Sequence, residues 1–151
     1  MGFKRKKKDY EPAWQTNDDE IFHFGALRWN VTKMKQWIKE NVDSLDILDI
    51  PVEPWAVFIE NVIRHREDHI DEVNIAEPLI AVEMLEDSII VVDGAHRILK
   101  AKKLGIENLK TYFLPFDLQV QFLINEWEYE QAITMWNNDC EQRSKKELVV
   151  D

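Results

Sequence analysis

The spacing of apolar and polar residues along the chain predicts helices and strands in alternation. The clearest helix is amphipathic, because its apolar side chains recur at i, i+3, i+4, i+7 and i+8: Trp55, Phe58, Ile59, Val62 and Ile63. We expect this helix to begin at Pro54 and to continue to Ile70 or Val73. Another helix is predicted after Thr32, which is a suitable N-cap residue.

Short apolar runs predict four strands, which are Leu45–Ile50, Leu79–Met84, Ile89–Val92 and Leu109–Leu114. A tight turn at Glu86-Asp87 joins the second strand to the third. Because Ile89–Val92 is apolar on both faces, we expect it at the centre of the sheet, beside Leu79–Met84 and Leu109–Leu114. A helix between Ile89–Val92 and Leu109–Leu114 makes a strand–helix–strand crossover, right-handed if the two strands are parallel.

The C-terminal part is expected to be helical, with one apolar stripe and a second, shifted one. Their members are Val120, Leu123, Ile124 and Trp127, and then Tyr129, Ile133 and Trp136. The predicted fold class is therefore α/β (α+β). It consists of a small mixed sheet with packed helices and with helical N- and C-terminal extensions.

Length and composition favour one domain. The 151 residues are 45% hydrophobic, which is enough to fill a single core. We expect this domain over residues 11–140, after a basic arm at 1–10 and before a charged tail at 141–151. The single cysteine excludes an internal disulfide framework, and no apolar run approaches the roughly 20 residues of a membrane span. No apolar segment of a secretory signal follows the basic start, so a cytoplasmic protein is expected.

The formal net charge of −10 opposes binding of a DNA backbone by the molecule as a whole. The exception is the basic arm, whose cations are Lys4, Arg5, Lys6, Lys7 and Lys8. This arm is suited to contact with nucleic acid or with an acidic protein partner. The alternative is a solvated terminus that aids solubility.

The segment Ser88–Gly105 carries the strongest chemical signal. A strand stops at Asp93-Gly94, where glycine permits a sharp corner, and a helix follows at once that Gly105 would end. The first turn of this helix combines free backbone N–H groups with a carboxylate, an imidazole and a guanidinium. Helix N-terminal N–H donors and a planar cation hold phosphate in many proteins, so we expect a phosphate site here, although the carboxylate itself would repel phosphate.

Each residue of this corner has an expected role. Gly94 and Ala95 would offer backbone N–H groups, while Arg97 would form two parallel hydrogen bonds to phosphate oxygens. His96 would donate to the same phosphate or to a leaving oxygen. Asp93 would orient His96 or Arg97, or hold a magnesium ion through water.

Lys100 and Lys103 extend the positive face of the same helix. Lys100 would add a phosphate contact. The alternative is that both lysines are solvated and complement the C-terminal end of the helix.

The run Asp93-Gly94-Ala95-His96-Arg97, with Leu104-Gly105 closing the helix, resembles the signature of the ParB/sulfiredoxin superfamily. The upstream segment Glu77–Val82 is similar to the family's Pro-Ile-x-Val strand. The matching part runs from about Leu45 to Pro115, roughly half of the chain. Lys100 departs from the family, whose members usually carry a small residue there.

The resemblance is closest to the free-serine kinases of the superfamily. It implies a nucleotide (ATP, ADP or CTP) with Mg²⁺, and phosphoryl transfer to a small hydroxyl acceptor or nucleotide hydrolysis. In those kinases a glutamate soon after the corresponding strand is thought to deprotonate the acceptor, and Glu53 is the candidate here. Asp93 and His96 are the other candidate catalytic residues, and Asp93 is the candidate metal ligand. An exposed loop carboxylate without a catalytic role is the alternative for Glu53.

Other branches of the superfamily fit less well. Sulfiredoxin chemistry needs a cysteine where this chain has Ala95, and the one thiol, Cys140, lies outside the matching part. ParB clamp proteins typically carry arginine in place of His96, and the segment after Pro115 is too short for their additional domains. A non-catalytic binding module acting on a protein or nucleic-acid partner through the Lys4–Lys8 arm is the alternative to an enzyme.

His65 and His69 have the i, i+4 spacing of a metal-binding pair. The zinc-peptidase pattern requires glutamate directly after the first histidine, but this chain has Arg66, whose cation opposes a metal. We therefore expect these residues to lie on a solvated helix.

Overall fold

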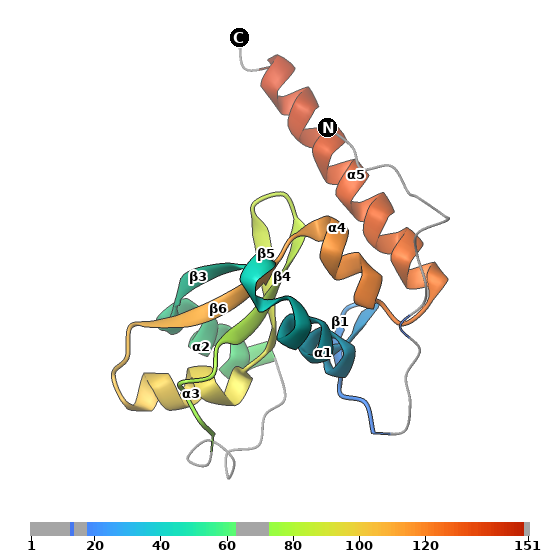
Figure 1. The fold of residues 1–151 in the computed structure, drawn as a ribbon. Coiled ribbons are helices and arrows are strands. Elements are labelled where there is room, and N and C mark those ends of the chain that lie inside the picture. The colour runs from blue at the N-terminus through green and yellow to red at the C-terminus, as the bar shows by residue number, and fades with distance from the viewer. Residues whose placement is uncertain (1–12, 14–17, 63–72, 150–151) are drawn as a thin grey trace. The chain divides into compact units, whose positions relative to one another are not determined.

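The computed structural model describes residue 13 and residues 18–62 and 73–149 (Figure 1). The chain forms two compact units. The first comprises Met1–Val42, Val82–Ile90 and Pro115–Asp151, and the second comprises Asp43–Ala81 and Val91–Leu114. The described helices show no stretch with the length and apolar character needed to cross a membrane.

The main sheet has four strands in the order β3-β6-β4-β5. Their bounds are Asp46–Pro51 for β3, Leu79–Leu85 for β4, Ser88–Asp93 for β5 and Asn108–Leu114 for β6. All four predicted strands are thus present, and β3 pairs antiparallel with β6. With its helices, this sheet confirms the predicted small α+β class.

The prediction that Ile89–Val92 lies at the centre of the sheet is wrong. Ile89–Val92 belongs to β5, which lies at an edge and follows β4 after the two-residue turn at Glu86-Asp87. The inner strands are β6 and β4, and the first four residues of β4, Leu79–Val82, are all buried. In β5 only Val91 and Val92 are buried, whereas Ser88 is exposed and the other three residues are partly buried. The sequences of β4 and β5 are both apolar on both faces, but of these two strands only β4 has a neighbouring strand on each side.

Helix α3, Ala95–Lys103, connects β5 to β6, as the crossover prediction requires. However, β4 lies between β5 and β6 in the sheet, so the crossover spans a strand. Beside α3 packs α2, Val52–Val62, which begins two residues before the predicted Pro54. The expected continuation of α2 to Ile70 or Val73 lies outside the described residues.

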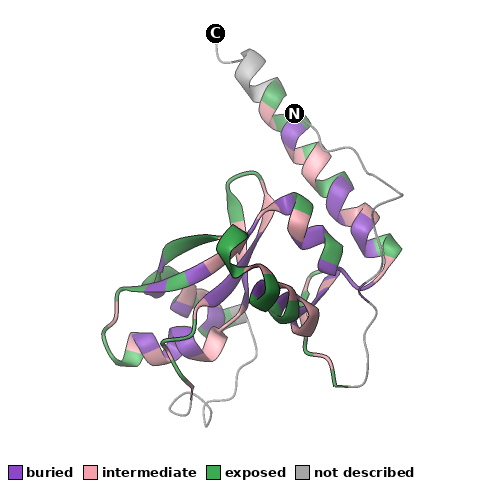
Figure 2. Cartoon of the chain, viewed as in Figure 1, coloured by how far each residue is buried: buried purple, intermediate pink, exposed green. Residues whose placement is uncertain are grey.

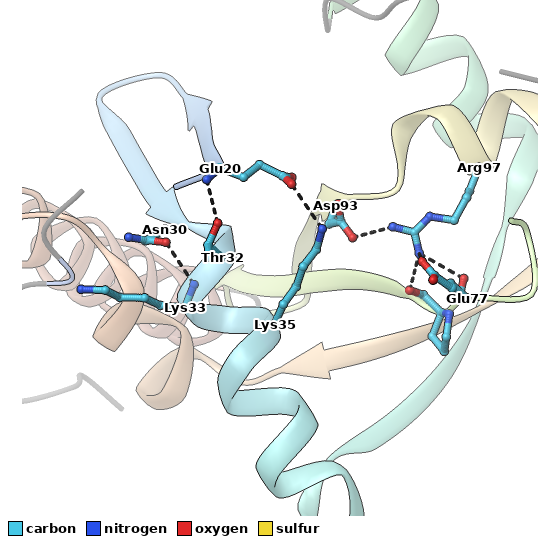
Figure 3. A network of polar contacts seen from close by, with 9 residues as sticks. Glu20, Asn30, Thr32, Lys33, Lys35, Glu77, Asp93 and Arg97 are labelled. Carbon is cyan, nitrogen blue, oxygen red and sulfur yellow. Dashed lines mark hydrogen bonds and ion pairs between the residues drawn. The ribbon is translucent and has the colours of Figure 1, made fainter. Parts of the chain in front are cut away.

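In the first unit, a hairpin that the sequence pattern did not indicate precedes helix α1, Val31–Asn41. It pairs β1, Ile21–Phe24, with β2, Leu27–Asn30. The predicted N-cap Thr32 is wrong, because Asn30 caps α1: its side-chain oxygen accepts from the Lys33 amide at 3.0 Å. Thr32 lies inside the helix, and its hydroxyl accepts from the Glu20 amide at 2.7 Å (Figure 3).

The C-terminal region is helical, as expected, but it is broken into three pieces. They are α4, Phe116–Gln119, a 3₁₀ turn, Val120–Phe122, and α5, Glu126–Val149. The break places Trp127 on the outer side of α5, 57% exposed, so its predicted place in the apolar stripe is wrong. Tyr129 and Ile133 are buried as predicted, and Figure 2 shows the buried residues on one side of α5.

Two arginines tie α5 to the rest of the first unit. Arg28 on β2 contacts the buried Glu128 carboxylate with both Nε and Nη2, at 3.2 and 2.9 Å. This hydrogen bonding raises the pKa of Arg28. Arg143 donates to the Glu86 carbonyl at 2.8 Å and to the Asp139 carboxylate. The hydrogen bond to Asp139 raises the pKa of Arg143.

Candidate functional site

The Asp93–Arg97 motif forms the corner between β5 and α3. Asp93 ends the strand, Gly94 is the N-cap, and Ala95 is the first helical residue. Gly94 has φ +115°, a region that favours glycine, and its carbonyl accepts the first helical hydrogen bond from the Ile98 amide at 3.0 Å. The predicted strand–glycine–helix corner is therefore present.

A neighbouring side chain also excludes a larger residue at this corner. A Cβ atom added to Gly94 would lie 2.2 Å from Cδ2 of Leu79, the fully buried first residue of β4. The inner side of the corner is therefore filled by Leu79, and the backbone turn is fixed by packing as well as by its dihedral angle.

The guanidinium of Arg97 points into the protein. Nη2 contacts the Asp93 carboxylate, and Nη1 donates to the carbonyls of Glu77 and Pro78 at 3.1 and 2.6 Å (Figure 3). The side chains of Arg97 and Asp93 are only 10% and 12% exposed. Arg97 thus connects the start of α3 to the end of β5 and to the chain just before β4. These contacts occupy Nη1 and Nη2, the guanidinium nitrogens that were expected to bind phosphate.

Asp93, Gly94, Ala95 and His96 are each partly exposed, whereas Arg97 is buried. The first three amides of a helix have no acceptor within the helix, and the helix dipole adds positive potential at that end. The accessible part of the motif therefore offers backbone N–H groups and the His96 imidazole. Both suit an anion.

Lys100 lies one turn further along α3, and its ammonium donates to the Val73 carbonyl at 2.9 Å. In the same helix Lys102 pairs with Glu60 of α2 at 3.2 Å. Contacts within the second unit thus engage these two lysines, and the predicted phosphate contact of Lys100 gains no support from its position.

Glu53 lies away from the motif. It is an exposed residue in the first turn of α2, directly after Val52, whose amide donates to the Glu107 carbonyl at 2.8 Å. Glu107 follows the C-terminal end of α3, whereas Gly94 caps its N-terminal end. A helix of this length spans roughly 13 Å, so the structure does not bring Glu53 to Gly94.

A bound magnesium ion does not fit the described side chains of the motif. The Asp93 carboxylate is held by Arg97, whose cation opposes a metal at that position. Among the residues described, no group of three or more histidine, cysteine, aspartate or glutamate side chains is placed to hold a metal ion. The pair His65 and His69, which was expected on a solvated helix, and the Lys4–Lys8 arm lie outside the described residues.

The sequence did not indicate the partners of Arg97 in the segment before β4. The carbonyls of Glu77 and Pro78 belong to the backbone, so no residue type marks them as acceptors. The i, i+4 spacing of Asp93 and Arg97 was visible, but it ordinarily signals a pair within one helix. Here Asp93 lies in the strand, and the turn at Gly94 brings the two side chains together.

Comparison with known proteins adds no identification: no family model, curated protein or solved structure matches this chain.

Proposed function

We propose that this chain is a nucleotide-binding module of the ParB/sulfiredoxin type, which holds phosphate groups at the first turn of α3. The observation that carries the proposal is the corner itself: Gly94 at φ +115° turns a strand directly into a helix whose first residues are partly exposed. This is the context in which such a motif binds phosphate through backbone amides.

The Arg97–Asp93 pair supports the proposal indirectly. Amide donors hold an anion well when they are fixed before it arrives, because little ordering is then lost on binding. Arg97 fixes the first turn of α3 through Asp93 and through the Glu77 and Pro78 carbonyls. Arg97 is therefore assigned a positioning role, and direct contact is assigned to the backbone of residues 94–97 and to His96.

The position of Glu53 favours binding over phosphoryl transfer. A general base must come within hydrogen-bond reach of the proton that it removes. Glu53 follows β3 near Glu107, at the opposite end of α3 from Gly94. Phosphoryl transfer or nucleotide hydrolysis at this corner thus requires a base other than Glu53.

Calorimetric titration with ATP, ADP and CTP, each with and without Mg²⁺, tests the proposal. His96→Ala should weaken the affinity for the nucleotide that binds by about 1.5–3 kcal/mol, the range for hydrogen bonds to charged groups. The control is His23→Ala, because His23 is exposed on β1. It should bind like the unaltered protein.

Two results would contradict the proposal: no binding of any of the three nucleotides, or equal affinities for His96→Ala and the unaltered protein. Product analysis on the same samples separates module from enzyme. Formation of a phosphorylated acceptor or of free phosphate would favour the enzyme.

A further inference from the structure

Among the described residues, strand β3 has a neighbouring strand on one side only. It forms one end of the four-stranded sheet, and β6 is its one neighbour among the described strands. All its residues except Ile50 are exposed, and Figure 2 shows most of the strand in green. A strand at a sheet edge presents backbone N–H and C=O groups to which another strand can pair.

The middle of β3 is apolar on both faces. Ile47 is 53% exposed and lies opposite Tyr112 of β6, while Leu48 is 37% exposed and lies opposite Thr111. Consecutive residues of a strand point to opposite faces, so an added strand would find an apolar side chain on each. Edges that avoid pairing usually carry charged side chains, lysine above all, or proline. Strand β3 has two aspartates but no lysine, and its one proline, Pro51, is its last residue.

Two carboxylates flank this apolar pair. Asp46 and Asp49 are both exposed, and Asp49 lies 2.9 Å from Lys110 of β6. A second copy of the chain is a poor partner for such an edge. Antiparallel pairing centred between Ile47 and Leu48 would set Asp46 opposite Asp49 twice, and like charges directly opposite each other are destabilising. Each chain also has a net charge of −10.

We propose that β3 binds an extended segment of another protein, which adds a strand to the sheet. The partner segment carries a cation, two apolar residues and a second cation, opposite Asp46, Ile47, Leu48 and Asp49. Backbone hydrogen bonds supply the affinity, and side chains on the two faces supply the selectivity, as in other cases of strand addition. This inference concerns a different surface from the nucleotide site and does not depend on it.

Two labelled peptides test the proposal, one with the core Lys-Val-Ile-Lys and one with the core Glu-Val-Ile-Glu. Fluorescence anisotropy should show binding of the first in preference to the second. Amide chemical shifts in the unaltered protein should change at residues 46–49 and at their partners in β6. Binding of neither peptide, equal binding of both, or shifts confined to other residues would overturn the proposal.

A charge reversal sharpens the test. Asp46→Lys should weaken binding of the lysine peptide by about twofold to thirtyfold and strengthen binding of the glutamate peptide, because a cross-strand attraction becomes a repulsion. The matched control is Asp18→Lys, which changes the net charge equally at an exposed turn before β1. Equal effects of the two variants would overturn the proposal, since they would reflect net charge alone. Sedimentation of the unaltered protein as a dimer that dissociates on Ile47→Lys would also overturn it, in favour of a second copy.

Discussion

Arg97 and Asp93 form an ion pair across Gly94, with the guanidinium on α3 and the carboxylate at the end of β5. Both side chains are nearly buried, so the two strongest charges of the motif neutralise each other inside the protein. A ligand at this corner therefore meets backbone amides and His96, and the Arg97 charge reaches it only as part of a pair. This relationship changes what each residue of the motif is expected to contribute.

Arg97→Ala should lower the free energy of unfolding by about 3–5 kcal/mol, because it removes the Arg97 guanidinium from a nearly buried carboxylate. It also leaves the carbonyls of Glu77 and Pro78 without the donor that Arg97 supplies. Urea denaturation followed by circular dichroism measures the change. The control is Lys102→Ala on the same helix, whose pair with Glu60 is exposed and should contribute less than about 1 kcal/mol. Equal small losses in both variants would contradict the clamping role of Arg97.

Gly94→Ala should destabilise the protein by about 2–5 kcal/mol. The substitution adds strain at φ +115° and a Cβ atom 2.2 Å from Leu79, so two costs combine. Gly25→Ala is the matched control, because Gly25 has φ +59° with nothing within 4 Å of the added atom. Gly25→Ala should lower the free energy of unfolding only by the cost of backbone strain, about 1–2 kcal/mol. Thermal or urea unfolding of the two variants compares them directly, and similar losses would mean that Leu79 moves aside without cost.

Local sequence signals predicted the elements around the motif well. Four short apolar runs predicted four strands, each within one residue of its observed bounds. Gly105, predicted to end α3, has φ +72°, and its amide donates to the Lys102 carbonyl while the Ile106 amide donates to the Ala101 carbonyl. These bonds form a Schellman motif, which a glycine after a helix commonly signals.

Features that depend on distant parts of the chain, such as strand order, were predicted less well from the sequence. The central position of β4 follows from which strands surround it, and the apolar runs of β4 and β5 are alike in the sequence. To act as the base for a phosphate held at this corner, Glu53 would have to lie near Gly94. The antiparallel pairing of β3 with β6 instead places Glu53 beside Glu107, since Pro51 lies opposite Asn108. Strand order and direction determine whether Glu53 and Gly94 lie close together, and the sequence pattern does not specify them.

The N-cap of α1 offers a test of one corrected assignment. Asn30 is fully buried: its side-chain oxygen accepts from the Lys33 amide, and its nitrogen donates to Asp19 at 2.9 Å. Asn30→Ala should cost about 1–2 kcal/mol, the upper part of the range for N-cap residues. Thr32→Ala removes a single exposed hydrogen bond to Glu20 and should cost less, about 0.5–1 kcal/mol. Urea denaturation ranks the two, and a larger loss for Thr32→Ala would restore the threonine as the more important residue at this helix start.

Glu53→Gln tests the separation of the carboxylate from the corner at Gly94. The substitution keeps the size and polarity of the side chain but removes its capacity to accept a proton. Loss of a general base typically lowers turnover by about 10²–10⁴, whereas a residue at the far end of α3 should change neither nucleotide affinity nor any turnover that is detected. We expect affinity within about twofold of the unaltered protein, which is a difference of less than 0.5 kcal/mol. The one expected cost is in stability, about 0.3–1 kcal/mol, because Glu53 is a negative charge in the first turn of α2.

For Glu53→Gln, calorimetry measures nucleotide affinity, product analysis measures turnover and urea denaturation measures the free energy of unfolding. His96→Ala is the comparison, and it should lose nucleotide affinity. The two variants separate the roles because Glu53 follows β3, whereas His96 lies in the first turn of α3. A hundredfold loss of turnover in Glu53→Gln with affinity unchanged would make Glu53 the base. The reacting group would then have to lie toward Glu107, at the C-terminal end of α3, and the corner at Gly94 would serve only to hold the nucleotide.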